Sequence, residues 1–148
     1  MVKHLDDNHP LLPDHVGVDL FKAALSWKAR LESAMVARGH AWYGDARSAV
    51  AAHLDPRGLP QSELVARMGL TKQAVQQLLD SLEADGIVRR EADPADGRSK
   101  RVVYTAKGLR ALHDGVEVKR AIETEYRDKL GPRAYEAFVS ALRKLARP

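Results

Sequence analysis

Apolar residues recur at steps of three and four along most of the chain, the spacing that places side chains on one face of a helix. The first such stretch covers residues 14–38, where Val16 and Leu31 belong to one stripe. Phe21 and Leu25 widen this stripe, so we expect a long helix that is buried on more than one side.

Shorter helices are predicted in the next part of the chain. One is expected at residues 45–54, and another of about two turns begins near Pro60, where the missing N–H of proline is not needed. Thr71 is suited to cap a fourth helix by accepting from a backbone N–H of its first turn, and Gly86 is suited to end it. The buried side of this fourth helix is predicted to consist of Val75, Leu78, Leu79 and Leu82.

Two β-prone runs come next, at residues 87–91 and 100–105, and a segment rich in turn formers separates them at 92–99. This pattern predicts a β-hairpin with a long tip. Thr105 can then cap a long helix whose apolar stripe is interrupted near Gly115, where we expect a bend.

The predicted order is four helices, a hairpin and two more helices, the last of which follows Gly131 and Pro132. Two short helices joined by residues 68–71 have the spacing of a helix-turn-helix, and a hairpin directly after them makes a winged helix. The predicted fold is therefore mainly α with a small β-hairpin wing, in the order α-α-α-α-β-β-α-α, within a single domain spanning residues 1–148.

The fourth helix presents polar side chains that can bond to base edges and to phosphates. Gln pairs in a bidentate manner with adenine, and Lys reaches guanine or a phosphate. Free N–H groups at the start of this helix and of the preceding one can also hold phosphates. The candidate DNA-binding residues on the two helices are Gln61, Ser62, Thr71, Lys72, Gln73, Gln76 and Gln77. A solvated helix face without a partner is the alternative interpretation.

Positive charge gathers around the predicted hairpin. Arg98, Lys100 and Arg101 lie at its tip and just past it, and Lys107 follows. This concentration suits phosphates or the narrow minor groove of DNA, and a solvated loop does not require it. The net charge of +4 is compatible with a polyanionic partner but does not by itself identify one.

Five stretches of the sequence carry a further signal: residues 59–64, 68–75, 82–90, 93–98 and 104–108. The most specific is Asp-Pro-x-Asp-x-Arg at 93–98, which follows Asp-Gly-Ile-Val at 85–88. Together these stretches resemble the MarR family of bacterial transcription regulators.

The resemblance implies a homodimer in which residues 14–38 and 106–147 interlock, while residues 45–105 form a winged-helix lobe on each half of a pseudo-palindromic operator. It also implies that Arg98 enters the minor groove and that Asp96 orients this arginine or another nearby. Family habit favours a repressor that a small phenolic or other aromatic compound releases from double-stranded DNA. Dimerisation also agrees with the three wide apolar helix faces outside the DNA-reading module, which a monomer of this size would not cover.

One residue of the first predicted helix and three residues that follow this helix are candidates for an effector pocket. Trp27, His40, Trp42 and Tyr43 could line a cavity and stack on a small aromatic ligand. Core packing is the alternative interpretation of the same residues.

Other classes of function find little support. There is no cysteine, so disulfides and thiolate chemistry are excluded, and the six histidines show no spacing that suggested a metal site. No nucleophile or nucleotide-binding motif is present, so we expect neither an enzyme nor a cofactor. Without an apolar leader or membrane span we expect a cytoplasmic protein with no membrane partner. The rival hypothesis is a winged helix used for protein contact or for non-specific, architectural DNA binding.

Overall fold

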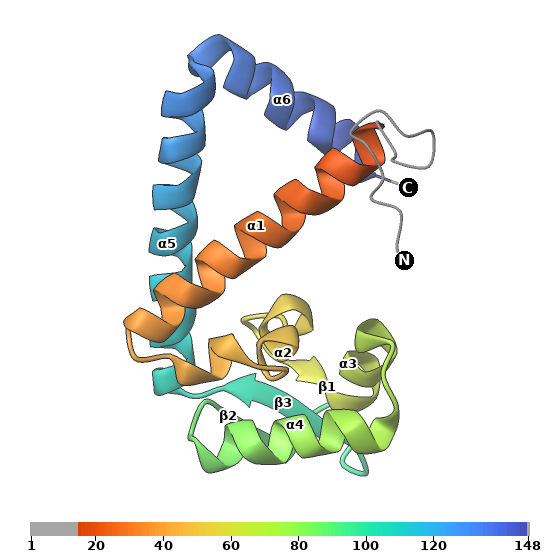
Figure 1. Cartoon of the computed structure of the whole chain (residues 1–148). Coiled ribbons are helices and arrows are strands. Elements are labelled where there is room, and N and C mark those ends of the chain that lie inside the picture. The colour runs from red at the N-terminus through yellow and green to blue at the C-terminus, as the bar shows by residue number, and fades with distance from the viewer. Residues whose placement is uncertain (1–14, 148) are drawn as a thin grey trace, which may run out of the picture.

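The computed structural model describes residues 15–147 and divides into a helical part and a mixed lobe of helices and strands (Figure 1). The helical part consists of α1 (Val16–Ala37), α5 (Ala106–Leu130) and α6 (Pro132–Leu145). The lobe contains η1 (Ala41–Gly44), α2 (Ser48–His53), α3 (Gln61–Met68), α4 (Lys72–Ala84), β1 (Leu59–Pro60), β2 (Val88–Ala92) and β3 (Lys100–Tyr104). The fold class predicted from the sequence is confirmed. Asp14, with which the first helix was predicted to start, lies outside the described residues.

The predicted hairpin is part of a three-stranded antiparallel sheet with the order β1-β3-β2. Val88 of β2 pairs with Tyr104 of β3, and Leu59 of β1 pairs with Val102 on the other edge of β3. The third strand is a correction to the prediction of two. It spans only two residues, and one of them is Pro60, so no alternation of apolar and polar residues could reveal it.

The second predicted helix, at residues 45–54, is also corrected. A 3-10 turn forms first, at Ala41–Gly44, and α2 begins only at Ser48. The carboxylate of Asp45 accepts from the backbone N–H of Arg47 at 2.9 Å, which closes a turn just before the helix. This local hydrogen bond competes with helical geometry, as is usual for Asp near a helix start.

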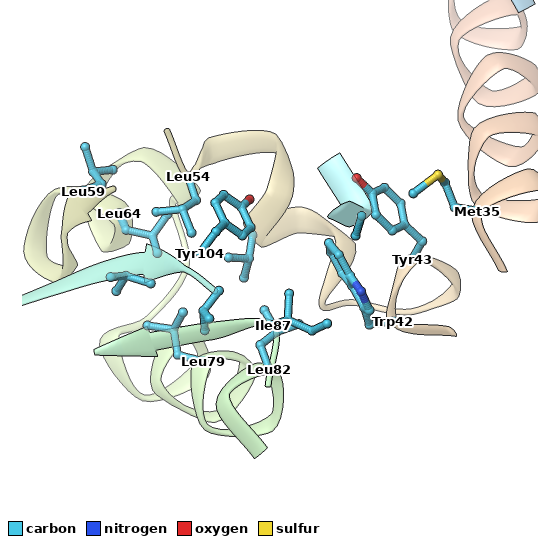
Figure 2. Close-up of a cluster of buried hydrophobic side chains, with 14 of the residues drawn as sticks. Met35, Trp42, Tyr43, Leu54, Leu59, Leu64, Leu79, Leu82, Ile87 and Tyr104 are labelled. Carbon is cyan, nitrogen blue, oxygen red and sulfur yellow. The ribbon is translucent and has the colours of Figure 1, made fainter. Parts of the chain in front are cut away.

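The lobe is built on one apolar core between α3, α4 and the sheet. Leu64, Val75, Leu79 and Val102 are completely buried there. Trp42 and Tyr43 continue this core toward α1: their ring centroids are 4.2 Å apart, and Figure 2 shows Trp42 on the side of Ile87 and Tyr43 beside Met35. The largest fully buried side chains in residues 15–147 are Met35, Val50, Leu64, Val75, Leu79, Leu82, Ile87, Val88 and Val102.

Helix α5 runs without interruption from Ala106 to Leu130, so Gly115 does not end it, and the bend expected there stays a prediction. Gly115 lies beside the 3-10 turn: a Cβ at this position would lie 3.4 Å from the Tyr43 hydroxyl, an ordinary van der Waals contact.

Helix α1 does not meet the expectation of burial on more than one side within this chain. Leu31 and Met35 are its only buried residues, whereas Val16, Phe21 and Leu25 are exposed. Apolar side chains are exposed on α6 as well, among them Phe138 and Leu145. None of the helices in residues 15–147 is both long and apolar enough to cross a membrane.

Candidate nucleic-acid interface

Two short helices, α3 and α4, meet at a tight turn whose backbone is fixed by local chemistry. Gly69 ends α3 with a φ of 63°, a left-handed conformation that glycine adopts without a steric cost. Thr71 then caps α4, because its side-chain oxygen accepts from the backbone N–H of Ala74 at 3.1 Å. The predicted cap is confirmed, and the start of α4 is fixed with its free N–H groups exposed.

The exposed side of α3, one face of α4 and the wing surround one groove with a volume of about 740 Å³. Its lining is formed by Gln61, Ser62, Val65, Lys72, Gln76, Asp80, Glu83, Arg90, Arg98, Ser99 and Lys100. Two segments that are well separated in the sequence, the helix-turn-helix and the wing, thus face the same space. Lysine and arginine outnumber the two carboxylates in this lining, which favours an anionic ligand.

The tip of the wing is held by its aspartates. The carboxylate of Asp96 accepts from the backbone N–H of Arg98 at 3.0 Å, and Asp93, which is buried, accepts from the backbone N–H of Ala95 at 2.9 Å. The Arg98 side chain is exposed and forms no ion pair with any residue in the range 15–147. Asp96 therefore orders the backbone that carries Arg98 and leaves its guanidinium available.

The structure brings together six of the candidate residues and separates the others. Gln61, Ser62, Lys72, Gln76, Arg98 and Lys100 all line the groove. Gln73 and Gln77 are exposed on the neighbouring stripe of α4, about 100° around the helix axis from Lys72 and Gln76. Thr71 lies at the helix start, where its side chain serves as the cap.

The four positively charged residues predicted to cluster around the hairpin do not all face the groove. Arg98 and Lys100 face the groove, but Arg101 donates to the backbone carbonyl of Arg57 at 2.7 Å, and Lys107 donates to that of Asp85 at 2.8 Å. Two of the four cations thus tie the wing and α5 to the lobe. Closeness in sequence could not separate Lys100 from Arg101, because neighbouring strand residues point to opposite faces of a sheet.

Three charged residues of the groove were not among the candidates: Asp80, Glu83 and Arg90. A signal for Asp80 was present, since it lies four residues after Gln76 and therefore on the same helix face. Arg90 enters the groove from β2, and its guanidinium contacts both acids. Only strand pairing reveals that contact.

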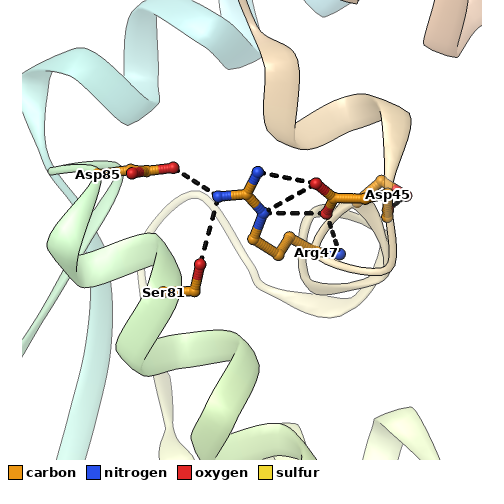
Figure 3. A network of polar contacts seen from close by, with 5 residues as sticks. Asp45, Arg47, Ser81 and Asp85 are labelled. Carbon is orange, nitrogen blue, oxygen red and sulfur yellow. Dashed lines mark hydrogen bonds and ion pairs between the residues drawn. The ribbon is translucent and has the colours of Figure 1, made fainter.

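The orientation of α4 depends on an ion-pair network at its far end (Figure 3). The Arg47 guanidinium, which is only 19% exposed, lies between Asp45 and the carboxylate of Asp85. It also donates to the Ser81 hydroxyl at 3.3 Å. The hydrogen bonds from Arg47 lower the pKa of Asp45, so this carboxylate stays charged over the neutral range. The network anchors the end of α4 to the segment before α2.

The four candidate effector residues occupy different environments. Trp42 and Tyr43 are buried core residues, which favours the core-packing interpretation for them, and burial raises the pKa of Tyr43. Trp27 is partly exposed on α1. His40 forms a hydrogen bond through Nε2 with Asp114 of α5 at 2.6 Å. The Nε1–H of Trp42 is buried without a hydrogen-bond partner among the residues the structure describes.

The structure brings together one group of side chains that could ligate a metal ion, which the spacing of the histidines in the sequence did not indicate. His113, Asp114 and Glu117 on α5 place one ligand atom each within 4.8 Å of one another. Both acids already have partners, however: Asp114 contacts His40, and Glu117 pairs with Arg38 at 2.8 Å. His4 and His9 lie outside the described residues. The absence of a metal remains a prediction.

A helix-turn-helix followed by an exposed basic wing, with a shared groove between them, defines a winged-helix protein of the DNA-binding type. Comparison with known proteins shows to which family of winged-helix proteins the chain belongs. The model of the MarR family matches residues 45–99. Over 91 residues the chain is 32% identical to the transcriptional regulator HosA of Escherichia coli O111:H-, an alignment that covers 62% of this chain and 67% of that protein. The chain belongs to the MarR family.

Solved structures agree with this assignment over nearly the whole length. CouR from Rhodococcus jostii RHA1, bound to p-coumaroyl-CoA, is 26% identical with a TM-score of 0.67, covering 91% of this chain and 94% of that one. The transcriptional repressor CouR bound to a 23-mer DNA duplex is 25% identical with a TM-score of 0.65, covering 90% and 93%. The helices on both sides of the lobe are therefore shared along with the lobe itself.

Proposed function

We propose that this MarR-family regulator binds double-stranded DNA in a sequence-specific manner through the groove between α3, α4 and the wing. The observation that carries the proposal is that Lys72 and Gln76 of α4 and Arg98 and Lys100 of the wing line one groove. Lys72 and Gln76 of α4 read base edges in the major groove, and Arg98 reaches the adjacent minor groove. The free backbone N–H groups at Gln61 and Ser62, at the start of α3, contact a phosphate.

The active form is a homodimer on a pseudo-palindromic operator, with the parts outside residues 45–105 providing the interface. Exposed apolar side chains on α1 and α6 support this assignment, because Val16, Phe21 and Leu145 would otherwise remain in water. Two lobes related by a two-fold axis then meet two half-sites about one helical turn apart. The site of action is the cytoplasm.

The regulator represses transcription, and a small aromatic ligand releases it from DNA. The relative CouR supports this, since it is a repressor of known structure both with a DNA duplex and with p-coumaroyl-CoA. In this chain the ligand would lie near Trp27, His40, Trp42 and Tyr43, where the unpartnered Nε1–H of Trp42 offers a donor. Tryptophan fluorescence with p-coumaroyl-CoA and simple aromatic acids as probes tests this part: Trp42→Phe should weaken binding, and unchanged affinity would remove Trp42 from the site.

Selection of bound sites from a random duplex pool tests the DNA-binding function. A sequence-reading dimer should return a palindromic consensus, with a specificity ratio of about 10³ or more over random DNA and a steep salt dependence. An architectural protein would keep the salt dependence and return no consensus, and a protein-contact module would show neither. Either of these outcomes would contradict the proposal.

A further inference from the structure

A chain of hydrogen bonds crosses the proposed DNA-binding groove and joins three elements of the lobe. Nε2 of Gln61 on α3 donates to Oε1 of Gln76 on α4 at 2.8 Å, and Nε2 of Gln76 donates to Oδ1 of Asp80 at 3.3 Å. The same oxygen of Asp80 accepts from the guanidinium of Arg90 on β2. All four side chains line the groove, so the chain lies where bases would be read.

Arg90 is the fixed end of this chain. Its side chain is only 12% exposed, and its Nη2 also contacts Oε2 of Glu83 at 3.1 Å. The backbone N–H of Arg90 donates to the other oxygen of Glu83 at 2.9 Å. Because β2 is held to α4 by side chain and backbone together, Asp80 is kept in place by a group that can only donate.

The carboxylate of Asp80 gives the chain its direction. A glutamine amide has two orientations that exchange its donor and acceptor ends, and Gln61, itself an amide, is compatible with either orientation of Gln76. An ionised carboxylate only accepts, so the Nε2 end of Gln76 must face Asp80. The Oε1 end then faces Gln61, which donates to it.

We propose that Asp80 and Gln61 are specificity-determining positioning residues, which hold the amide of Gln76 in one orientation before DNA binds. This inference rests on the proposed DNA-binding function. With the amide fixed, Gln76 presents its remaining N–H and lone pair to a base pair in a fixed order. Adenine shows its N7 acceptor and N6 donor in a fixed order along the major groove, so one orientation discriminates where a freely flipping amide would not.

Site selection with the full-length protein tests the inference, using Gln76→Ala, Gln61→Ala and Asp80→Ala with Gln77→Ala as the matched control. Gln76→Ala should reduce discrimination at one base pair per half-site by about 5-fold or more. Gln61→Ala and Asp80→Ala should relax the same base pair, without a uniform loss of affinity for all sequences. Gln77→Ala changes an exposed glutamine of the same helix outside the groove and should leave that position unchanged.

Asp80→Asn provides a rescue, because it keeps an acceptor oxygen that Arg90 holds toward itself and Gln76. It should retain the base preference that Asp80→Ala loses. If Asp80→Ala fails to fold, Gln61→Ala still carries the test, since it leaves the contact between Asp80 and Arg90 intact.

The outcomes separate this inference from the function on which it rests. A wild-type protein that selects no consensus contradicts the proposed function. A wild type with a clear consensus that Gln76→Ala relaxes at one position, while Gln61→Ala and Asp80→Ala do not, overturns the inference alone. Uniform weakening by Asp80→Ala on all sequences would also overturn it, because Asp80 would then have only a structural role.

Discussion

Arg47, just before α2, donates through Nη1 to the carboxylate of Asp85, the residue that ends α4, at 2.5 Å. This contact joins the end of the proposed recognition helix to the segment that leads from α1 into the lobe. Lys107 at the start of α5 donates to the backbone carbonyl of the same Asp85 at 2.8 Å. The end of α4 is thus tied both to the segment before α2 and to the start of α5. Removing the Arg47 side chain should have measurable consequences.

Arg47→Ala should lower the free energy of unfolding by about 1 to 3 kcal/mol, because a charged hydrogen-bond donor shielded from solvent is removed from two carboxylates. Urea denaturation measures this change. Arg57→Ala is the matched control: Arg57 pairs with Asp55 two residues earlier, as Arg47 does with Asp45, but its side chain is 88% exposed. The control should change stability far less than Arg47→Ala does, because solvent screens an exposed pair. Equal effects of the two substitutions would contradict the anchoring role of Arg47.

Thr71→Ala should destabilise the protein by about 1 kcal/mol, because the backbone N–H of Ala74 loses its capping partner. Thr71→Ser keeps the hydroxyl oxygen and should retain most of the stability. Thermal unfolding followed by circular dichroism compares the three proteins. A serine variant as unstable as the alanine variant would show that the methyl group of Thr71, and not its cap, is what matters.

Arg98→Ala should weaken binding to the selected operator while the dimer stays intact. The slope of the logarithm of the binding constant against the logarithm of the salt concentration should fall in magnitude by about one. The reason is that Arg98 is exposed beside the groove and forms no ion pair within residues 15–147. Fluorescence anisotropy at several salt concentrations measures both effects. Arg133→Ala removes an exposed arginine of α6 and serves as the control with matched net charge. Unchanged affinity for Arg98→Ala would remove the wing from the interface.

Phe21→Glu should shift the protein from dimer to monomer, since Phe21 is 65% exposed on α1 and the substitution would bury a charge in the proposed interface. Sedimentation equilibrium gives the oligomeric state. Leu70→Gln changes an apolar residue that is also exposed but lies in the helix-turn-helix, and should leave the dimer unaffected. A wild-type protein that sediments as a monomer at micromolar concentration would refute the assignment of these helices.

Asp114→Asn should change how the free energy of unfolding depends on pH in the acidic range. The hydrogen bond with His40 lowers the pKa of Asp114 below the ordinary value of an aspartate. A carboxyl group with a lower pKa in the folded state stabilises the protein above its unfolded pKa, and this contribution is lost as the pH falls through the folded pKa. The decline in unfolding free energy on acidification below about pH 5 should therefore be shallower for Asp114→Asn than for wild type.

Asp128→Asn is the control for this experiment, because it changes an exposed carboxylate on the same helix. Urea denaturation across a series of pH values compares the three proteins. If Asp114→Asn and wild type lose stability in parallel, the contact between His40 and Asp114 does not contribute to the folded state in the way the structure indicates.

Local chemistry along the chain was sufficient to predict most elements. The caps at Thr71 and Thr105 depend on a hydroxyl and a backbone N–H three residues later, and both hydrogen bonds are found at 3.1 Å. The stripe in α4 and the turn formers at 92–99 likewise act over a few residues. Such signals are visible in the sequence because both partners are neighbours in it.

Which residues line the groove could not be predicted from such local signals. Gln61, Gln76 and Arg90 are close together only because β2 pairs with β3 and α3 packs beside α4. The sequence placed positive charge near residues 98–107 but could not show that Arg101 and Lys107 turn back to the protein. Which partner a long side chain takes depends on the faces that distant elements present to it.

The sequence by itself therefore determined the order of helices, the helix-turn-helix with its caps, and the family, because periodicity, capping and turn motifs are local. Tertiary structure decided the third strand at Leu59–Pro60, the direction of the Gln61–Gln76–Asp80–Arg90 chain, and the exposure of the apolar face of α1. These features depend on contacts between residues far apart in the chain, whose geometry exists only once the core of the lobe has formed.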